Sequence, residues 1–286
     1  MLRPEQMRRL LIATPKGEIE TIISELYRHN VYHIEDFVPE SESAEALSIG
    51  HPLPGASDAA SALIKVRAIE NACGIDPDNV EIRTKLPASK VRAMIETDLP
   101  SIQKEVEDLV ATRSKLEARQ KEHEQRAREL EPFAAVPLDL ELYRGYTRFT
   151  VFTGHIMHDV SIDVPHEKYF SDKVDGNMIV VVVANEHREE VERTLLDAGF
   201  QVIPIPEETG APADRLAAHI DETRQANTEI AAVNEKIAGV RERHTDLLVA
   251  CDELLTADVE RAEAPLRFAT TEETFITEGW VPGDQA

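Results

Sequence analysis

The sequence predicts an α+β protein: a dumbbell of two small α/β lobes, each built from β-α-β units, joined by a long antiparallel two-helix coiled coil. Two long segments repeat an apolar residue every three or four positions, which is typical of paired helices. A block of alternating strand and helix patterns separates them, and strand patterns occur near both chain ends. One helix therefore leads out to the middle block and the other leads back.

The amino-terminal segment predicts a β-α-β unit. Residues 10–13 predict a short apolar strand, and Thr14-Pro15 is typical of a helix start. Apolar residues then recur at helical spacing and predict one buried stripe: Ile19, Ile22, Ile23 and Leu26. Asn30 can end this helix in the left-handed conformation, and residues 31–37 are the predicted return strand.

Three segments follow this unit. Residues 39–55 are acidic, hold Ser, Pro and Gly without periodicity, and predict a loop. Residues 59–73 predict a helix that Gly74 ends, because their apolar residues fall on one face. Residues 79–86 have the pattern of a short strand.

The carboxyl-terminal tail contributes to the same lobe. Residues 266–270 and 274–281 predict two strands that lie beside the amino-terminal unit. The first lobe is therefore expected to comprise residues 1–90 and 264–286.

The coiled-coil strut is expected to comprise residues 91–132 and 212–263. The first helix has a seam with alternating steps of three and four: Leu99, Ile102, Val106, Leu109, Arg113, Leu116, Gln120, His123, Ala127 and Leu130. The second helix continues the same alternation: Leu216, His219, Thr223, Ala226, Ile230, Val233, Ile237, Val240, His244, Leu247, Cys251 and Leu254. Residues 91–96 are either a separate helix or the kinked start of the first one.

The middle block, residues 133–211, predicts the second α/β lobe. It holds a helix at residues 186–198, which Gly199 ends. Its strand patterns cover four ranges: residues 148–154, 156–164, 178–184 and 200–205. If these residues fold as one unit with its ends close together, the two long helices pair antiparallel.

The charge balance excludes some classes of ligand. The chain of 286 residues carries 54 acidic against 31 basic side chains, a net charge of −23. Such a chain repels nucleic-acid phosphate and anionic lipid head groups, so we expect no nucleic-acid partner. The chain also lacks nucleotide and phosphate motifs, and we expect no small-molecule substrate and no cofactor.

No catalytic, cofactor-binding or metal-ligating residue is predicted. His29 and His33 straddle a helix end and a strand, and His155 and His158 would point to opposite faces of a strand. Other histidines occupy seam positions, where a polar residue more often sets the register of a coiled coil: His123, His219 and His244. We therefore expect a non-catalytic, structural protein.

The two cysteines, Cys73 and Cys251, lie far apart in the sequence. One pair defines no disulfide framework, and we expect two reduced, buried thiols.

Four segments resemble one known family. The segments are Leu2-Arg3-Pro4-Glu5-Gln6-Met7, Val31-Tyr32-His33-Ile34-Glu35-Asp36, Arg148-Phe149-Thr150-Val151-Phe152-Thr153-Gly154 and Phe275-Ile276-Thr277-Glu278-Gly279-Trp280-Val281-Pro282. Together, and in this order, they resemble the amino-terminal cytoplasmic half of subunit I, or subunit a, of archaeal and bacterial A/V-type rotary ATPases. The last segment is the most specific, because it is similar to the pattern F-x-x-x-G-W-V-P that precedes the membrane domain of that family.

The resemblance implies a stator subunit at the cytoplasmic face of the cell membrane. In that family the two lobes bind the peripheral stalks, heterodimers of E-type and G/H-type subunits, and so couple ATP synthesis or hydrolysis to proton or sodium transport. The membrane rotor ring is contacted by a carboxyl-terminal membrane domain that has no counterpart before Ala286. We therefore expect this chain to be a soluble fragment, and no residue of the ion pathway is assigned to it.

Two other functions compete with this one. The first is a generic coiled-coil adaptor that links two partner proteins, which the helix periodicity alone would allow. The second is a ligand-binding α/β protein with a coiled-coil arm, against which the missing nucleotide and phosphate motifs argue.

Overall fold

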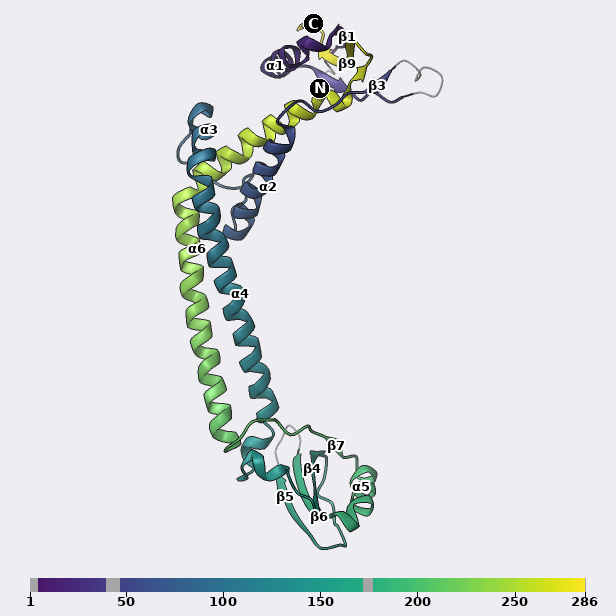
Figure 1. Cartoon of the computed structure of the whole chain (residues 1–286), viewed down its shortest axis with the longest axis vertical. Helices are drawn as coiled ribbons and strands as arrows, with labels where there is room; N and C mark the ends of the chain where they lie inside the picture. The colour runs from purple at the N-terminus through teal and green to yellow at the C-terminus, as the bar shows by residue number, and fades with distance from the viewer. Residues whose placement is uncertain (1–4, 40–46, 172–176, 286) are drawn as a thin grey trace. The chain divides into compact units, whose positions relative to one another are not determined.

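The computed structural model describes residues 5–39, 47–171 and 177–285 (Figure 1). The chain divides into two compact units, Met1–Val110 with Lys236–Ala286, and Ala111–Glu235. In the described residues the fold is mixed α/β, with one sheet in each unit and two long helices. These are α4 (Leu99–Leu130, 32 residues) and α6 (Pro212–Glu263, 52 residues). The predicted mixture of sheets and long helices is confirmed.

The sheet of the first unit is built around the carboxyl-terminal strand β9 (Thr274–Pro282). Strand β1 (Met7–Pro15) pairs antiparallel with the whole of one edge of β9. Strands β2 (His33–Glu35) and β8 (Ala269–Thr270) pair antiparallel with the other edge. Because β1 and β2 both oppose β9, they run parallel to each other, and the β-α-β unit is completed by a strand inserted between its own two strands.

Helix α1 (Ile19–His29) connects β1 to β2 and covers the core of this sheet. Asn30 ends it in the left-handed conformation, with φ 49° and ψ 37°, as predicted. Ile23 is buried with Phe268 and Phe275, whose rings stack at 5.6 Å between centroids. The predicted apolar stripe of α1 therefore packs on aromatic residues from the other end of the chain.

Three further helices pack in the first unit. Helix α2 (Ala56–Cys73) confirms the helix predicted there, and Gly74 ends it with φ 65°. Helix α3 (Ala88–Thr97) is separate from α4, which decides between the two alternatives for residues 91–96. Ion pairs join α2, α3 and α4 to α6, through Arg67–Asp252, Arg92–Asp258 and Arg243–Glu105 respectively.

Several strand predictions in this unit were wrong. Residues 79–86 form no strand, and the backbone N–H of Arg83 donates to the Asp246 carboxylate of α6 instead of to a neighbouring strand. Within residues 266–270 only β8 is a strand, because Leu266 and Arg267 belong to a 3-10 helix, η5 (Ala264–Arg267), which Phe268 ends. The predicted loop 39–55 holds a two-residue strand, β3 (Ser48–Ile49), which pairs with β8; its residues 40–46 lie outside the described part of the chain.

The sheet of the second unit is antiparallel, in the order β5-β6-β4-β7. Its central strand β6 (Asn177–Ala184) lies between β5 (His166–Ser171) and β4 (Phe149–Ile156), and β7 (Gln201–Val202) pairs with β4. The predicted strand 156–164 was wrong, because Val160 N–H bonds to the Asp159 carboxylate and the adjacent strand begins only at His166.

Strand β6 is buried on both faces. Met178 and Val180 pack with the aromatic residues Phe133 and Tyr143, which follow α4. On the other face, Ile179, Val181 and Val183 pack with residues that include Val191 and Leu195 of α5 (Arg188–Asp197). This burial explains why β6 has a continuous apolar sequence instead of an alternating one.

Within the second unit α4 and α6 lie side by side and run antiparallel. Arg119 of α4 pairs with Glu222 of α6, and His123 of α4, one turn later, pairs with His219, which lies one turn earlier on α6. The predicted seam positions are the covered ones: His219, Ala226 and Val233 of α6 are buried, whereas the residues immediately beside them in the sequence are exposed. The three-four spacing therefore correctly identified the contact face of each helix in this unit.

Gly279 marks a close approach between β9 and β2. A Cβ atom at this position would lie 2.4 Å from the carbonyl oxygen of His33 and 2.6 Å from the ring of Tyr32. Gly154 of β4 is similar, with the Phe200 ring at 2.3 Å from such an atom. Close packing leaves no room for a side chain at either position, which explains why both hold glycine. Both glycines belong to segments that resemble the rotary ATPase family.

We expect Gly279→Ala to lower the free energy of unfolding of the first unit by about 1–3 kcal/mol, because the methyl group meets backbone and ring atoms that cannot yield freely. The matched control is Gly239→Ala in the interior of α6, where the added Cβ would meet only the end of the Arg243 side chain, at 3.5 Å. Removing a helical glycine there should raise the stability by about 0.5–1 kcal/mol. Urea unfolding measures both changes, and equal effects of the two substitutions would contradict the packing argument.

Candidate functional site

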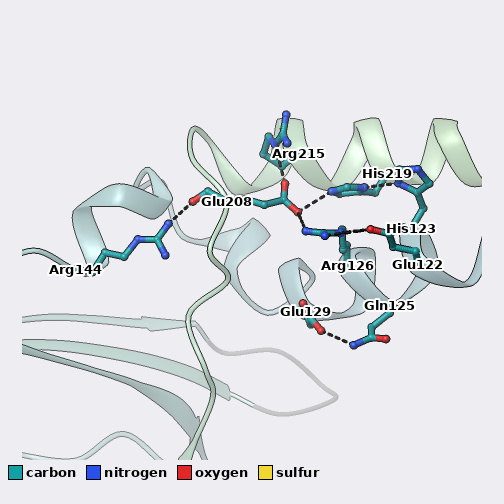
Figure 2. A network of polar contacts seen from close by, with 9 residues as sticks. All are labelled: Glu122, His123, Gln125, Arg126, Glu129, Arg144, Glu208, Arg215 and His219. Carbon is teal, nitrogen blue, oxygen red and sulfur yellow. Dashed lines mark hydrogen bonds and ion pairs between the residues drawn. The ribbon is translucent and has the colours of Figure 1, made fainter. Parts of the chain in front are cut away.

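A partly buried carboxylate, Glu208, gathers three basic side chains in the second unit (Figure 2). It lies in the segment between β7 and α6, and its side chain is 11% exposed. His219 Nε2 lies 2.8 Å from Oε1, and Arg215 Nε donates to Oε2 at 2.8 Å. Arg126 of α4 approaches Oε1 with Nη1 at 3.5 Å. One carboxylate thus connects both long helices to the segment that enters α6.

The backbone of Glu208 is also held. Arg144, which follows the 3-10 helix η3 (Leu140–Tyr143), donates from Nη2 to the carbonyl oxygen of Glu208 at 2.6 Å. Glu141 of η3 accepts a hydrogen bond from Gly210 N–H at 2.7 Å. The segment before α6 is therefore fixed to η3 from both sides of Glu208.

Glu208 is ionised in this setting. Burial raises the pKa of its carboxyl, but the hydrogen bonds from His219 and Arg215 outweigh burial and hold that pKa below its usual value. An ionised carboxylate only accepts hydrogen bonds. His219 must therefore carry a hydrogen on Nε2. Only its other ring nitrogen, Nδ1, can then be either protonated or bare.

His123 and His219 form a pair across the seam between α4 and α6. Their Nδ1 atoms lie 2.8 Å apart, and the ring centroids lie 5.1 Å apart. His219 is 8% exposed and His123 is half-buried. The pair is flanked by ion pairs from Arg119 to Glu222 and from Arg126 to Glu122. A polar contact thus occupies two seam positions where a coiled coil ordinarily places apolar residues.

A second candidate site is a groove in the first unit. It has a volume of about 510 Å³ and lies between α1, β2 and the end of α6. Its walls include Ile23, Leu26, Tyr27, Tyr32 and Phe268. Leu266, on its rim, is 42% exposed. The groove is open to solvent and is lined by these apolar side chains together with Glu260, Glu263 and Arg267, and protein-docking surfaces commonly combine apolar and charged groups in this way.

Glu70 of α2 is a buried acid in the first unit. It is 3% exposed, and its Oε1 has no hydrogen-bond partner. Burial and the nearby Asp252 carboxylate raise the pKa of Glu70 to about 7. Glu70 therefore takes up a proton on folding at neutral pH, because an unfolded glutamate has a pKa near 4.3.

The remaining histidines that the sequence analysis considered lie in different surroundings. His29 and His33 are exposed, and His29 lies 3.9 Å from Glu25. His158 is exposed, whereas His155 Nδ1 is buried without a hydrogen-bond partner. Burial and Arg243 lower the pKa of His244. Across residues 5–39, 47–171 and 177–285, no three His, Cys, Asp or Glu side chains are grouped so as to hold a metal ion.

The two cysteines are buried and reduced, as predicted. Cys73 lies at the end of α2 and Cys251 lies in α6. Burial raises the pKa of Cys251 to about 11, so this thiol stays protonated at neutral pH.

Sequence reasoning identified His123 and His219 as seam residues but did not pair them with Glu208. Glu208 lies in an irregular segment with no periodicity, so no sequence signal connects it to α4. Glu70 did carry a signal: Leu63, Val66, Glu70 and Cys73 follow the three-four spacing of a buried stripe. An acidic residue in such a stripe is a candidate for a raised pKa.

Comparisons with known proteins agree with the resemblance seen in the sequence. No protein-family model matches the chain. The chain is 26% identical over 288 residues to A-type ATP synthase subunit I of Halobacterium salinarum, and 24% identical over 292 residues to the same subunit of Archaeoglobus fulgidus. Each match covers 99% of this chain but only 39% and 42% of the relatives, so the chain spans about two fifths of their length. The relatives are thus those that the sequence motifs indicated.

A solved structure is similar to the whole chain. It is the crystal structure of the cytoplasmic N-terminal domain of subunit I, homolog of subunit a, of V-ATPase. The TM-score is 0.51 at 16% sequence identity, and the match covers 96% of this chain and 93% of that one. At this identity the likeness establishes the fold. In the described residues no helix combines the length and the apolar character needed to cross a membrane.

We expect Glu208→Gln to lower the stability of the second unit by about 1 kcal/mol, because His219 and Arg215 lose a charged acceptor, while water screens the half-exposed Arg215 and Arg126 side chains. Glu207→Gln is the matched control, since Glu207 is the adjacent acid and is exposed. Hydrogen exchange of the amides at the start of α6 reports the change locally. The interpretation fails if both variants exchange at the rate of the unchanged chain.

We expect Glu70→Gln to raise the stability of the first unit at pH 8 and to change it by no more than about 1 kcal/mol at pH 5. Because the pKa of Glu70 is raised in the folded state, its contribution is fully present below about pH 4.3 and is lost as the pH rises through 7. The difference between the variant and the unchanged chain should approach about 3 kcal/mol at pH 8. Asp58→Asn, an exposed acid of the same helix, is the control.

Urea unfolding at the two pH values measures the effect of Glu70. A constant difference between the Glu70→Gln variant and the unchanged chain across this range would show that Glu70 is ionised throughout.

Proposed function

We propose that this chain is the amino-terminal part of subunit I in an A/V-type rotary ATPase and serves as part of its stator. The observation that carries the proposal is similarity to subunit I over 99% of the chain, together with a fold match over 96% of it. In this role the chain anchors the peripheral stalks to the membrane ion-translocating sector. ATP synthesis or hydrolysis is thereby coupled to proton or sodium transport.

The chain acts in the proposed complex as a dumbbell. Residues 1–90 and 264–286 form one lobe, residues 91–132 and 212–263 form the coiled-coil strut, and residues 133–211 form the other lobe. The antiparallel contacts of α4 with α6 in the second unit support this arrangement. At about 1.5 Å per residue, helices of 32 and 52 residues measure about 48 and 78 Å, a length suited to a strut.

The chain has no catalytic step of its own in this proposal, and its work is mechanical. A stator subunit must resist the torque of the rotor, and two paired helices resist bending better than one. The seam contacts and the ion pairs between α4 and α6 supply that stiffness. The polar cluster around Glu208 holds the strut to the adjoining lobe at the point where the chain enters α6.

The proposed partners are peripheral-stalk heterodimers of E-type and G/H-type subunits, which bind at both lobes. The groove beside α1 is our candidate surface in the first unit, because it exposes apolar side chains next to the sheet. Contacts with the membrane rotor ring come from the membrane domain of the whole subunit. The chain described here lies at the cytoplasmic face of the cell membrane.

We expect purified stalk heterodimers to bind this chain at near-physiological salt, as measured by isothermal titration calorimetry. Leu266→Glu, on the rim of the groove, should weaken the affinity at least about tenfold, because it places a charge in an apolar interface. Ile64→Glu is the matched control, since Ile64 is 69% exposed on α2 and lies outside the groove.

Two results would count against this proposal. If the unchanged chain binds no stalk heterodimer, the stator function is contradicted. If Leu266→Glu binds as tightly as the unchanged chain, the groove is not the docking surface in the first unit.

A further inference from the structure

The hydrogen bond between His123 and His219 joins two groups that can each donate or accept. We propose that this pair is a pH-sensitive clamp between α4 and α6, which holds with up to three ring protons and opens when a fourth is added. The proposal concerns this chain alone and does not depend on the stator function. It rests on the number of ring hydrogens that the contacts of His123 with His219 and of His219 with Glu208 can hold.

Glu208 sets the first proton. Its ionised carboxylate accepts from His219 Nε2 at 2.8 Å, so this nitrogen carries a hydrogen. When His219 is neutral, its Nδ1 is therefore bare. The 2.8 Å contact between the two Nδ1 atoms then requires His123 to donate from Nδ1. The neutral pair has one hydrogen-bond arrangement, with His123 donating to His219 and His219 donating to Glu208.

One additional proton can be accommodated. If His219 becomes an imidazolium, it donates from both nitrogens, to Glu208 and to His123. His123 then carries its own proton on Nε2 and accepts at Nδ1. The bond between the rings is retained and becomes charge-assisted.

A second additional proton cannot be accommodated. Two imidazolium rings would place two N–H donors face to face across 2.8 Å with no acceptor between them. The hydrogen bond would be lost and two positive charges would oppose each other within the seam. The contact is relieved only if the rings, and with them the two helices at this level, move apart.

The surrounding charges do not absorb a second imidazolium. The described contacts join three arginines, Arg126, Arg144 and Arg215, and two glutamates, Glu208 and Glu122, to this cluster, and a separate set of ion pairs nearby links Arg119 to Glu222 and Glu229. They come from α4, from α6, from the segment before α6 and from the residue after η3. Because the arginines of the cluster outnumber its glutamates, three to two, the cluster supplies no net negative charge for a second cation.

The limit of one extra proton makes the folded chain less stable at acidic pH. An unfolded chain can protonate both histidines, whereas the clamped pair takes only one extra proton. The unfolded state thus binds more protons once its two histidines together hold more than one, and stability is lost as the pH falls below the value near 6.5 at which unfolded histidines are half protonated. Glu208 acts in a lower window, because its pKa is lowered and its contribution is lost only below about pH 4.3.

The first experiment reads the ring protons directly. In a ¹⁵N-labelled sample of the full chain, long-range ¹H–¹⁵N correlation spectra distinguish which ring nitrogen carries hydrogen. At pH 8 we expect His123 to be protonated on Nδ1 and His219 on Nε2. Protonation of both rings on Nε2 alone would overturn the proposal, because neither Nδ1 could then donate.

The second experiment measures the consequence for the helices. Between pH 6.5 and 5.0 we expect the unfolding midpoint of the second unit to fall by about 5 °C, and hydrogen-exchange protection of α6 around residue 219 to fall at least about threefold. His123→Gln should remove more than half of both changes. His158→Gln, at an exposed position in the same unit, should leave them intact.

A full pH dependence in His123→Gln would overturn the proposal. If that variant does not fold, the proton positions in the unchanged chain decide the matter, since they require no substitution.

Discussion

The pairing of α4 with α6 in the second unit depends on satisfying polar side chains at seam positions. His123 and His219 occupy positions where apolar residues would pack without further requirements. Their burial is tolerated because His219 bonds to His123 on one side and to Glu208 on the other. Glu208 in turn is held by Arg215 and by the fixed backbone of the segment before α6. Helix register and the attachment of the lobe are thus parts of one network.

Periodicity predicted the helices well and the sheet edges poorly. The three-four seams identified the covered faces of α4 and α6, and the apolar run of β6 identified the central strand, because burial leaves a pattern in both cases. Strand β5 lies at an edge of its sheet and has a polar sequence, so it left no such pattern. Glu208 could not be found because its role depends on side chains that the fold, not the sequence, brings together.

The segments that resemble subunit I have structural reasons for their composition. Gly279 allows β9 to approach Tyr32 and His33, which belong to another of those segments. The carbonyl of Gln6, in the first segment, accepts a hydrogen bond from Gly283 N–H at 2.7 Å; residues 2–4 of that segment lie outside the described part of the chain. Three of the four segments thus meet at β9, where the two ends of this chain pack together.

The central claim of the proposed function is mechanical: α4 and α6 form an extended strut between two lobes. Small-angle X-ray scattering of the full chain in solution tests it most directly. An extended strut predicts a skewed pair-distance distribution with a long tail and a radius of gyration well above the roughly 19 Å expected for a compact domain of 286 residues. A symmetric distribution with a radius of gyration near that value would contradict it.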